Sequence, residues 1–440
     1  MRTPIVDFLN RYVESSPTRM HMPGHKGTLG YERDITEVSG ADSLYHADGI
    51  ILESERYSGE LFCSNSYFST EGSSLSIRAM LYLTSLYAGS IGRKNKILAA
   101  RNVHRSFVSA AALVDTEVEF FGFGDDYLSA IITKKELSEL LDKQTEPPAA
   151  VYVTSPDYLG RMQDVRELSE VCHERGILLL VDNAHGAYLA FSESKAHPIA
   201  LGADMCADSA HKTLPALTGA AYLHISRSAP RILSENAKSA LALFGSTSPS
   251  YLILESLDRL NALINEEFRS RLSIMERLVS ESKTQLSEIG YTVIEGEPLK
   301  ITVCATEYGY SGEALGKILE KNNIYPEFYD TDHLVLMLSA DNTEEDLKRL
   351  ISVMSEIPKG TPIVSERIAL TRPRRVTSIR EATLSPRESI DVESALGRVL
   401  ADCAVVCPPA VPILISGEEV DESAIKAFKY YGYNKISVIK

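Results

Sequence analysis

Short apolar runs alternate with amphipathic segments of helical period between about residues 90 and 225. The apolar runs are rich in branched side chains and have the length of buried strands. Strands that alternate with helices in this way form a mostly parallel sheet with helices on both faces. The expected strands cover 96–100, 118–121, 149–154, 177–182 and 220–224, and the expected helices include 105–115, 134–142 and 165–175.

The pattern changes after a long, charge-rich helical segment that we expect over 255–289, which Gly290 is suited to end. Shorter strand-like and helix-like segments follow, with helices expected at 312–322 and 343–356. We therefore predict an α/β fold in which a mostly parallel sheet is sandwiched by helices, with a smaller α+β carboxy-terminal domain. The predicted parts are an amino-terminal arm (1–60), a large domain that contains the parallel sheet (61–255), a connecting helix with a small α+β domain (256–360) and a carboxy-terminal segment (361–440).

Composition places the chain among ordinary globular proteins. Hydrophobic residues make up 44% and charged residues 24% of its 440 residues, which excludes disordered, collagen-like and disulfide-rich classes. The formal charge of -15 argues against a nucleic-acid partner and against an anionic membrane surface, and no apolar run is long enough to span a bilayer. Asp7 and Arg11 would interrupt the apolar core of a signal peptide, and the six scattered cysteines form no CxxC pair. We expect a cytoplasmic protein without a metal site.

Candidate catalytic residues follow two of the predicted strands. Asp182 ends one strand and precedes His185, while Ser209, His211 and Lys212 lie in a turn-like segment before another strand. Open α/β sheets bind ligands beyond the carboxyl ends of their strands. A lysine that can form an imine, a carboxylate that keeps a pyridine nitrogen protonated, and a hydroxyl and an imidazole near a phosphate are what pyridoxal 5'-phosphate requires. Considered alone, Asp182 could have a purely structural role. Considered alone, Lys212 would be a solvated surface lysine.

A phosphate site is predicted at STEGSS, where a helix is expected to begin. Gly72 allows a tight backbone, and Ser73 and Ser74 offer hydroxyl and N–H donors at the positive end of the helix dipole. An ordinary serine N-cap is the alternative. His104 follows the strand at 96–100, where its ring would either stack on a planar cofactor or cap the next helix.

Eight segments that occur in order from about residue 19 to 420 together resemble the bacterial ornithine/lysine/arginine decarboxylases. These segments are RMHMPGHKG, DITEVSGADSLYHADG, ARNVHRS, TSPDYLGRMQDV, VDNAHGAY, DSAHKTLPALTG, STSPSYLILESLD and PPAVPILISGEE. The resemblance implies a pyridoxal-phosphate enzyme with an aspartate-aminotransferase-like fold. It is strongest to the shorter members, which lack an amino-terminal wing domain.

The resemblance also implies a role for each candidate residue. Lys212 would bond covalently to the cofactor, and Asp182 would pair with its ring nitrogen. His104 would stack on the ring, and His185 would contact the ring face or its 3-oxygen. The phosphate would be held by Ser73, Ser74, Ser209 and His211, next to Gly72.

Further implications concern the assembly and the entrance to the site. In the family the STSP segment reaches a neighbouring subunit, so Ser246 and Thr247 would act across the interface of a homodimer. The entrance candidates are His25, Lys26, Asp34 and Glu37. Two positions depart from the family pattern: Ser76 and Ile77 stand where an Asn is common, and Asp42 with Ser43 stands where paired acids are usual.

The implied reaction is α-decarboxylation of a basic amino acid, arginine or lysine ahead of ornithine, with release of agmatine, cadaverine or putrescine and CO2. Lys212 or His211 would return a proton to the α-carbon. An aminotransferase or β-eliminating lyase remains an alternative, for which Arg372 or Arg374 could clamp a carboxylate. A catalytically silent scaffold or regulatory homologue is a third. Candidates for the distal substrate pocket are Tyr45, Asp42, Glu37 and Tyr329.

Overall fold

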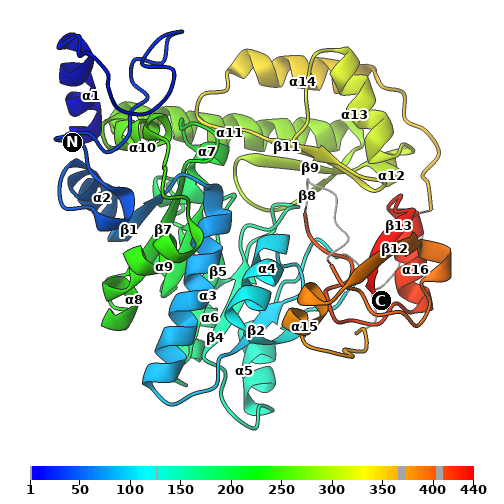
Figure 1. The fold of residues 1–440 in the computed structure, drawn as a ribbon. Coiled ribbons are helices and arrows are strands. Elements are labelled where there is room, and N and C mark those ends of the chain that lie inside the picture. Colours follow the sequence, from blue (N-terminus) through cyan, green and yellow to red (C-terminus); the bar gives the residue numbers. More distant parts are fainter. Residues whose placement is uncertain (1, 125–126, 365–371, 403–409) are drawn as a thin grey trace. The chain divides into compact units, whose positions relative to one another are not determined.

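The structure is a computed structural model that describes residues 2–124, 127–364, 372–402 and 410–440 (Figure 1). Its helices are α1 (Pro4–Glu14), α2 (Ile50–Leu61), α3 (Gly72–Ser90), α4 (Arg105–Val114), α5 (Lys134–Asp142), α6 (Val165–His173), α7 (Ala210–Thr213), α8 (Arg231–Glu235), α9 (Ala237–Phe244), α10 (Tyr251–Leu263), α11 (Glu266–Ile289), α12 (Ala305–Tyr308), α13 (Gly312–Lys321), α14 (Glu344–Glu356), α15 (Ile379–Leu384) and α16 (Glu422–Tyr430). Its strands are β1 (Ser64–Ser69), β2 (Lys96–Ala100), β3 (Glu117–Phe121), β4 (Ala150–Thr154), β5 (Leu178–Asp182), β6 (Met205–Asp208), β7 (Ala221–Ser226), β8 (Thr292–Ile294), β9 (Lys300–Cys304), β10 (Phe328–Tyr329), β11 (His333–Met337), β12 (Arg387–Asp391) and β13 (Lys435–Ile439).

The chain divides into two compact units. The first, called unit 1 below, comprises Met1–Asn95, Leu137–Val151 and Asp164–Ser270. The second, unit 2, comprises Lys96–Glu136, Tyr152–Gln163 and Arg271–Lys440. Each unit is described by itself.

A seven-stranded sheet with the order β1-β7-β6-β5-β4-β2-β3 carries the predicted apolar runs. Strands β5 and β6 pair in parallel, as do β2 and β3, whereas β7 runs antiparallel between β1 and β6. In unit 1, α3 packs against β6 and β7, and α6 packs against β5 (Figure 1). The predicted α/β fold with a mostly parallel sheet is confirmed.

The single helix expected over 255–289 is two helices, α10 and α11. The chain breaks after Leu263 because the Asn265 side chain accepts a hydrogen bond from the backbone N–H of Phe268 at 3.0 Å, which starts a new helix. Gly290 ends α11 as predicted, with a φ of +107° that L side chains rarely adopt.

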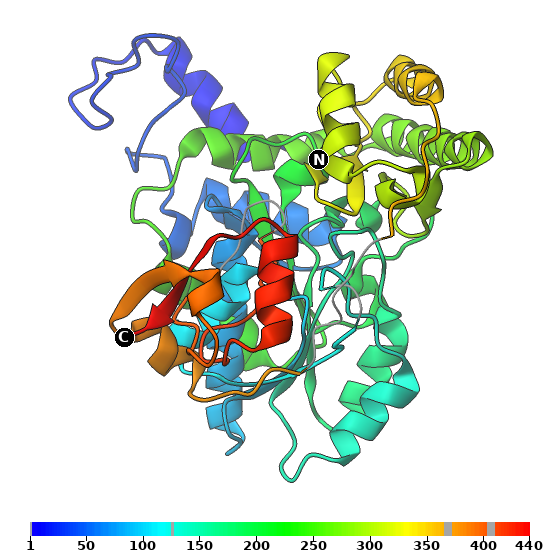
Figure 2. The ribbon, with the colours of Figure 1, turned by 90° about the vertical axis from the view of Figure 1, so that its right-hand side faces the viewer.

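Unit 2 contains the smaller α+β part. Its four strands follow the order β10-β11-β9-β8, and every pair is antiparallel. Nearer the carboxyl terminus, β12 pairs with β13, and a core around the fully buried Phe428 of α16 joins these elements, which are drawn in orange and red in Figure 2.

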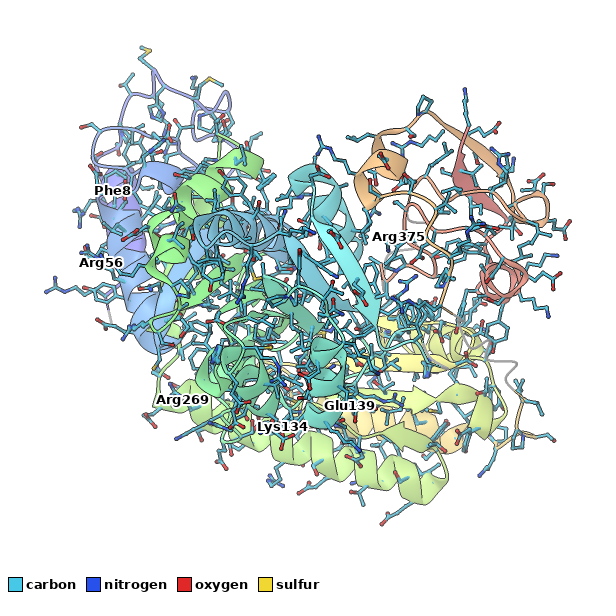
Figure 3. All side chains as sticks on the ribbon, turned by 90° about the horizontal axis from the view of Figure 1, so that it is seen from below. Phe8, Arg56, Lys134, Glu139, Arg269 and Arg375 are labelled. Carbon is cyan, nitrogen blue, oxygen red and sulfur yellow. The ribbon has the colours of Figure 1, made fainter. Side chains whose placement is uncertain are left out.

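Buried charges attach the carboxy-terminal residues to β2 and β3 within unit 2. Arg101, directly after β2, forms an ion pair of 3.2 Å with Glu418 and donates to the carbonyl of Ile413 at 2.8 Å. Arg375, labelled in Figure 3, approaches the same Glu418 to 3.6 Å and lies over the ring of Phe120 at 5.4 Å. Glu418 is therefore neutralised by two guanidinium groups, as burial of a charge requires.

Candidate active site

Asp182 is the last residue of β5, at the strand's carboxyl end. Its side chain is buried, with 2% of the residue exposed, and Oδ1 accepts a hydrogen bond from the backbone N–H of Ala184 at 3.2 Å. The strand places the carboxylate at this edge because its other residues, Leu178 to Val181, are all buried in the sheet. A buried carboxylate at a strand end can stabilise a cation much more strongly than a solvated one can.

Lys212 lies in the single-turn helix α7, which follows β6. Because β5 and β6 are parallel neighbours, their carboxyl ends bring Lys212 and the residues after Asp182 together. Lys212 Nζ lies 2.7 Å from Nε2 of the buried His185, a distance at which the amine donates to a neutral imidazole. The next imidazole, that of His211, donates from Nδ1 to the carbonyl of Ala220 at 2.9 Å.

The amino terminus of α3 offers donors for a phosphate. Ser209 Oγ donates to Ser73 Oγ at 2.8 Å, which joins the predicted phosphate residues of two segments far apart in sequence. Glu71, at the N-cap position, makes no side-chain cap, so the first-turn N–H groups, including that of Ser74, have no cap from their own helix. Gly72 has a φ of +70° and open space where a Cβ would project.

These residues fit pyridoxal phosphate. The uncapped helix end and two serine hydroxyls suit an anion, and the space beside Gly72 leaves room for it. Lys212 supplies the amine, and Asp182 the buried carboxylate. All of them lie in unit 1.

Comparison with known proteins gives the family. Residues 3–291 match the family described as Orn/Lys/Arg decarboxylase, major domain, and residues 372–435 match the Orn/Lys/Arg decarboxylase, C-terminal domain. The chain belongs to the Orn/Lys/Arg decarboxylase family. The family consists of pyridoxal-phosphate-dependent decarboxylases, so the chain is an enzyme of this class.

Relatives of this decarboxylase extend over nearly its whole length. The arginine decarboxylase of Halalkalibacterium halodurans is 26% identical and covers 96% of this chain and 92% of its own. The uncharacterized protein YaaO of Bacillus subtilis is 29% identical and covers 97% and 93%. Among solved structures, the lysine decarboxylase LdcF of Francisella novicida has a TM-score of 0.81 at 18% identity, covers 100% of this chain and 81% of its own, and so supports the fold. Within the described residues of the decarboxylase, no helix is both long and apolar enough to cross a membrane.

Ser246 and Thr247 are exposed in the decarboxylase, next to the amino terminus of α3. The Ser246 N–H donates to Glu71 Oε1 at 2.6 Å. Burial and the Glu71 carboxylate raise the pKa of Tyr45 to about 12, and a Cβ on Gly245 would lie 1.9 Å from the Tyr45 hydroxyl. Tyr45 and Glu71 thus lie beside the candidate phosphate site, and only tertiary contacts reveal Glu71, because an isolated glutamate carries no sequence signal.

His104 lies in unit 2 and caps helix α4 of the decarboxylase. Its ring nitrogen Nδ1 accepts the backbone N–H of Ser106 at 3.2 Å. This is the cap that the sequence offered as one explanation, and it fixes one edge of the ring. Stacking of His104 on the cofactor stays a prediction.

The entrance candidates lie on the amino-terminal arm. His25 Nε2 and Asp34 Oδ2 are 3.1 Å apart, and Lys26 donates to the carbonyl of His21 at 2.5 Å. Glu37 is exposed. The arm therefore brings His25 and Asp34 together, while Lys26 turns back onto the arm's own backbone.

Asp42 caps helix α2 of the decarboxylase. Its carboxylate accepts backbone N–H groups from Ser43 at 2.9 Å, Gly49 at 2.9 Å and Ile51 at 3.0 Å, and the residue is buried. Asp42 therefore organises its own loop and the first turn of α2. The sequence suggested Asp42 as a substrate contact. Its capping role could not be recognised there, because the N–H donors come from residues that only the fold brings round the carboxylate.

Replacing Asp42 with alanine should lower the free energy of unfolding by about 1–2 kcal/mol, the usual range for loss of a helix cap. Several buried N–H groups lose their acceptor. Urea unfolding of Asp42→Ala and of Asp42→Asn, which retains one acceptor oxygen, measures the effect. An unchanged midpoint for Asp42→Ala would contradict the capping role.

The remaining candidates lie in unit 2. The Tyr329 hydroxyl donates to Glu320 Oε1 at 3.1 Å. The side chains of Arg372 and Arg374 are 66% and 78% exposed and pair with Glu119 at 3.6 Å and Glu419 at 3.1 Å. Both guanidinium groups thus have acidic partners on the surface, which does not favour their use as a clamp for a substrate carboxylate.

A buried polar network around Asp208 carried no recognised sequence signal. Asp208 Oδ2 lies 2.9 Å from His197 Nε2 and 3.4 Å from His224 Nε2, while Oδ1 accepts from Asn183 at 2.7 Å and from the Cys206 thiol at 3.6 Å. Burial alone would raise the pKa of Asp208, but His197 and His224 outweigh it and lower that pKa well below its ordinary value. The His197, Asp208 and His224 atoms lie close enough to hold a metal ion. Asp208 already receives several donors, so we interpret the cluster as a hydrogen-bonded anchor for the ends of β5 and β6.

His224 gives this anchor a pH dependence. Burial lowers the pKa of His224, although Asp208 opposes the shift, so the folded protein resists protonation that the unfolded chain undergoes near its ordinary pKa of about 6.5. The contribution of neutral His224 to the free energy of unfolding should therefore be complete above pH 6.5. It should fall as the pH drops from 7 to 5, by up to about 1.4 kcal/mol per pH unit. Asp208 stays ionised in both states over this range, since its ordinary pKa is about 3.9.

Urea unfolding at pH 7 and pH 5 measures this effect. His224→Gln should show a smaller loss of stability on acidification than the unaltered protein does. His46→Gln, at an exposed histidine, is the matched control and should retain the original pH dependence. Equal pH slopes for His224→Gln and the control would show that another group is responsible.

Proposed function

We propose that this protein decarboxylates a basic amino acid with pyridoxal phosphate, acting on arginine or lysine ahead of ornithine and producing agmatine, cadaverine or putrescine. The observation that carries the proposal is the contact of 2.7 Å between Lys212 Nζ and His185 Nε2, beside the buried Asp182, at the ends of β5 and β6. Relatives of 26–28% identity named arginine decarboxylase support it. Several structural neighbours are lysine decarboxylases.

The cofactor, when bound, supplies an electron sink for the negative charge that develops at the α-carbon as CO2 leaves. Lys212 would hold its aldehyde carbon, and Asp182 would keep the ring nitrogen cationic, because an adjacent carboxylate favours the charged form. The α3 end, with Ser73, Ser74 and Ser209, would hold the phosphate. His185 would lie against the ring, and His104 would stack on it.

A proton must reach the α-carbon after CO2 has left. Lys212 or His211 would deliver it, since both belong to the same helical turn of α7. His185 lies within hydrogen-bond distance of Lys212 Nζ and would accept or return a proton there. A rigid turn at this position would hold the donor amine in one direction, which favours one face of the substrate.

The active form would be a cytoplasmic homodimer that supplies amines for polyamine biosynthesis. Ser246 and Thr247 would contact the phosphate site of the second subunit, which their exposure permits. Size measurement by light scattering, with cofactor bound, tests the dimer.

A product assay on arginine, lysine and ornithine tests the function. Without a keto-acid acceptor, we expect CO2 and one equivalent of the corresponding amine from at least one substrate. Transamination instead requires an acceptor and yields a keto acid. Absence of any turnover, with a cofactor spectrum that no basic amino acid alters, would contradict the proposal and favour a catalytically silent homologue.

A further inference from the structure

A cavity in unit 2 is lined mainly by aromatic side chains. Its volume is about 340 Å³, at the small end of the range for ligand sites. The rings come from three segments that are far apart in sequence: the residues after β3, the β10 strand, and the end of α16 with the turn that follows it. They are Tyr127, Phe328, Tyr329, Tyr430, Tyr431 and Tyr433.

Contacts between the rings hold several of them at steep angles to one another. The ring centroids of Tyr127 and Tyr431 are 4.8 Å apart at an interplanar angle of 59°, and those of Tyr430 and Tyr431 are 5.1 Å apart at 88°. Rings at such angles present both faces and edges around a small space. The negative face of an aromatic ring attracts ammonium and guanidinium groups.

Asp330 adds a negative charge to the wall of this cavity. Its Oδ1 closes a turn by accepting the backbone N–H groups of Asp332 at 2.8 Å and His333 at 2.6 Å. Its Oδ2 is buried and has no hydrogen-bond partner within the described ranges, and the side chain is only 10% exposed. His333 Nδ1 lies 3.4 Å from Oδ1 and would be a cation only when protonated.

The described remainder of the lining carries acidic and aromatic side chains. Among the described residues that line the cavity there is no lysine, arginine or histidine. Glu313, also in the lining, pairs on the surface with Lys317 at 2.5 Å, and Tyr430 donates its hydroxyl to the buried Asp332 at 2.8 Å. The electrostatic character of the cavity is therefore negative, with Asp330 as its main source.

We propose that this cavity binds the amine released by the reaction, an aliphatic chain that ends in an ammonium or guanidinium group. This inference rests on the proposed function for the identity of the amine. Decarboxylation removes the one negative charge of the amino acid, so the product carries one more net positive charge than the substrate. A cavity with a buried carboxylate, and with no cation among the described residues of its lining, favours the product, because the α-carboxylate of the substrate would be repelled.

Calorimetric titration of the full-length, cofactor-loaded protein tests the site. The ligands are agmatine, cadaverine and putrescine, the amino acids arginine and lysine, the uncharged pentane-1,5-diol, and a trimethylated alkylammonium that cannot react with the cofactor aldehyde. We expect the amines and the trimethylated cation to share a site that the diol does not occupy. Asp330→Asn, which keeps the oxygen that closes the turn, should lower the affinity of that site for these cations about tenfold.

Tyr431→Leu is the second variant. It should lower the affinity for the trimethylated cation by a similar factor, since it removes the faces of one aromatic ring. Glu345→Gln, an exposed acid of unit 2 outside the cavity, is the matched control and should bind as the unaltered protein does. Thermal unfolding of each variant verifies that it is folded. Unchanged binding in both folded cavity variants, or equal binding of the diol, would overturn the proposal.

Two further outcomes separate this inference from the proposed function. Normal decarboxylation, with amine binding that neither cavity variant alters, would refute the cavity site and leave the function intact. Cation binding that Asp330→Asn weakens, in a protein without turnover, would retain a cation site and refute the function. A raised KM in Asp330→Asn with unchanged product binding would assign the cavity to the substrate and overturn product selectivity.

Discussion

Lys212→Ala should lower turnover by about four orders of magnitude or more, because the amine that forms the covalent bond to the cofactor is lost. The backbone of α7 should remain, since alanine is a good helix former. Turnover is measured by CO2 release, and cofactor attachment by borohydride reduction followed by peptide mapping. In the unaltered protein the label should fall on the peptide that contains Lys212.

Lys143→Ala is the matched control, because Lys143 is an exposed lysine of the same unit and the same change removes one amine. This variant should retain its activity and its labelled peptide. Appreciable decarboxylation by Lys212→Ala, or a label on another lysine, would contradict the assignment of the catalytic amine.

Asp182→Asn should lower turnover by about two to four orders of magnitude. The amide has nearly the same shape and fits the same buried position, but it carries no charge to hold the ring nitrogen as a cation. Steady-state kinetics should show the loss mainly in kcat. The absorption spectrum of the bound cofactor should change with the protonation of its ring.

Asp142→Asn gives the same chemical change at an exposed carboxylate whose side chain is 65% accessible, and it should leave kcat unaltered. Thermal unfolding of Asp182→Asn separates a chemical effect from a folding defect. Near-normal activity of a folded, cofactor-loaded Asp182→Asn protein would mean that another group protonates the ring.

Several strands could be predicted because their residues are buried on both faces. The run expected at 96–100 coincides with β2, and that expected at 177–182 differs from β5 by one residue. Five of the described strands were not predicted: β1, β6, β10, β12 and β13. β1 reads SNSYFS, in which polar side chains interrupt the apolar pattern, and β6 has only four residues, too few for a periodic signal.

Within the candidate site, the sequence identified the residues that stand at strand ends and helix starts. Lys212 with His185, and Ser73 with Ser209, are indeed brought within hydrogen-bond distance. The capping role of Asp42 could not be predicted, because an aspartate that caps a helix and one that binds a substrate are identical in the sequence. The backbone donors that decide between them come from residues up to ten positions away.

The sequence by itself therefore determined the alternation of strands and helices, the family and the set of polar residues beyond the strand ends, since each depends on local order along the chain. Tertiary structure alone decided the Asp208 network and the aromatic cavity beside Asp330. The network joins β5, β6, β7 and His197, and the cavity joins three distant segments of unit 2. Burial, hydrogen bonding and charge at such places depend on which distant residues come into contact, and a local sequence pattern does not show those contacts.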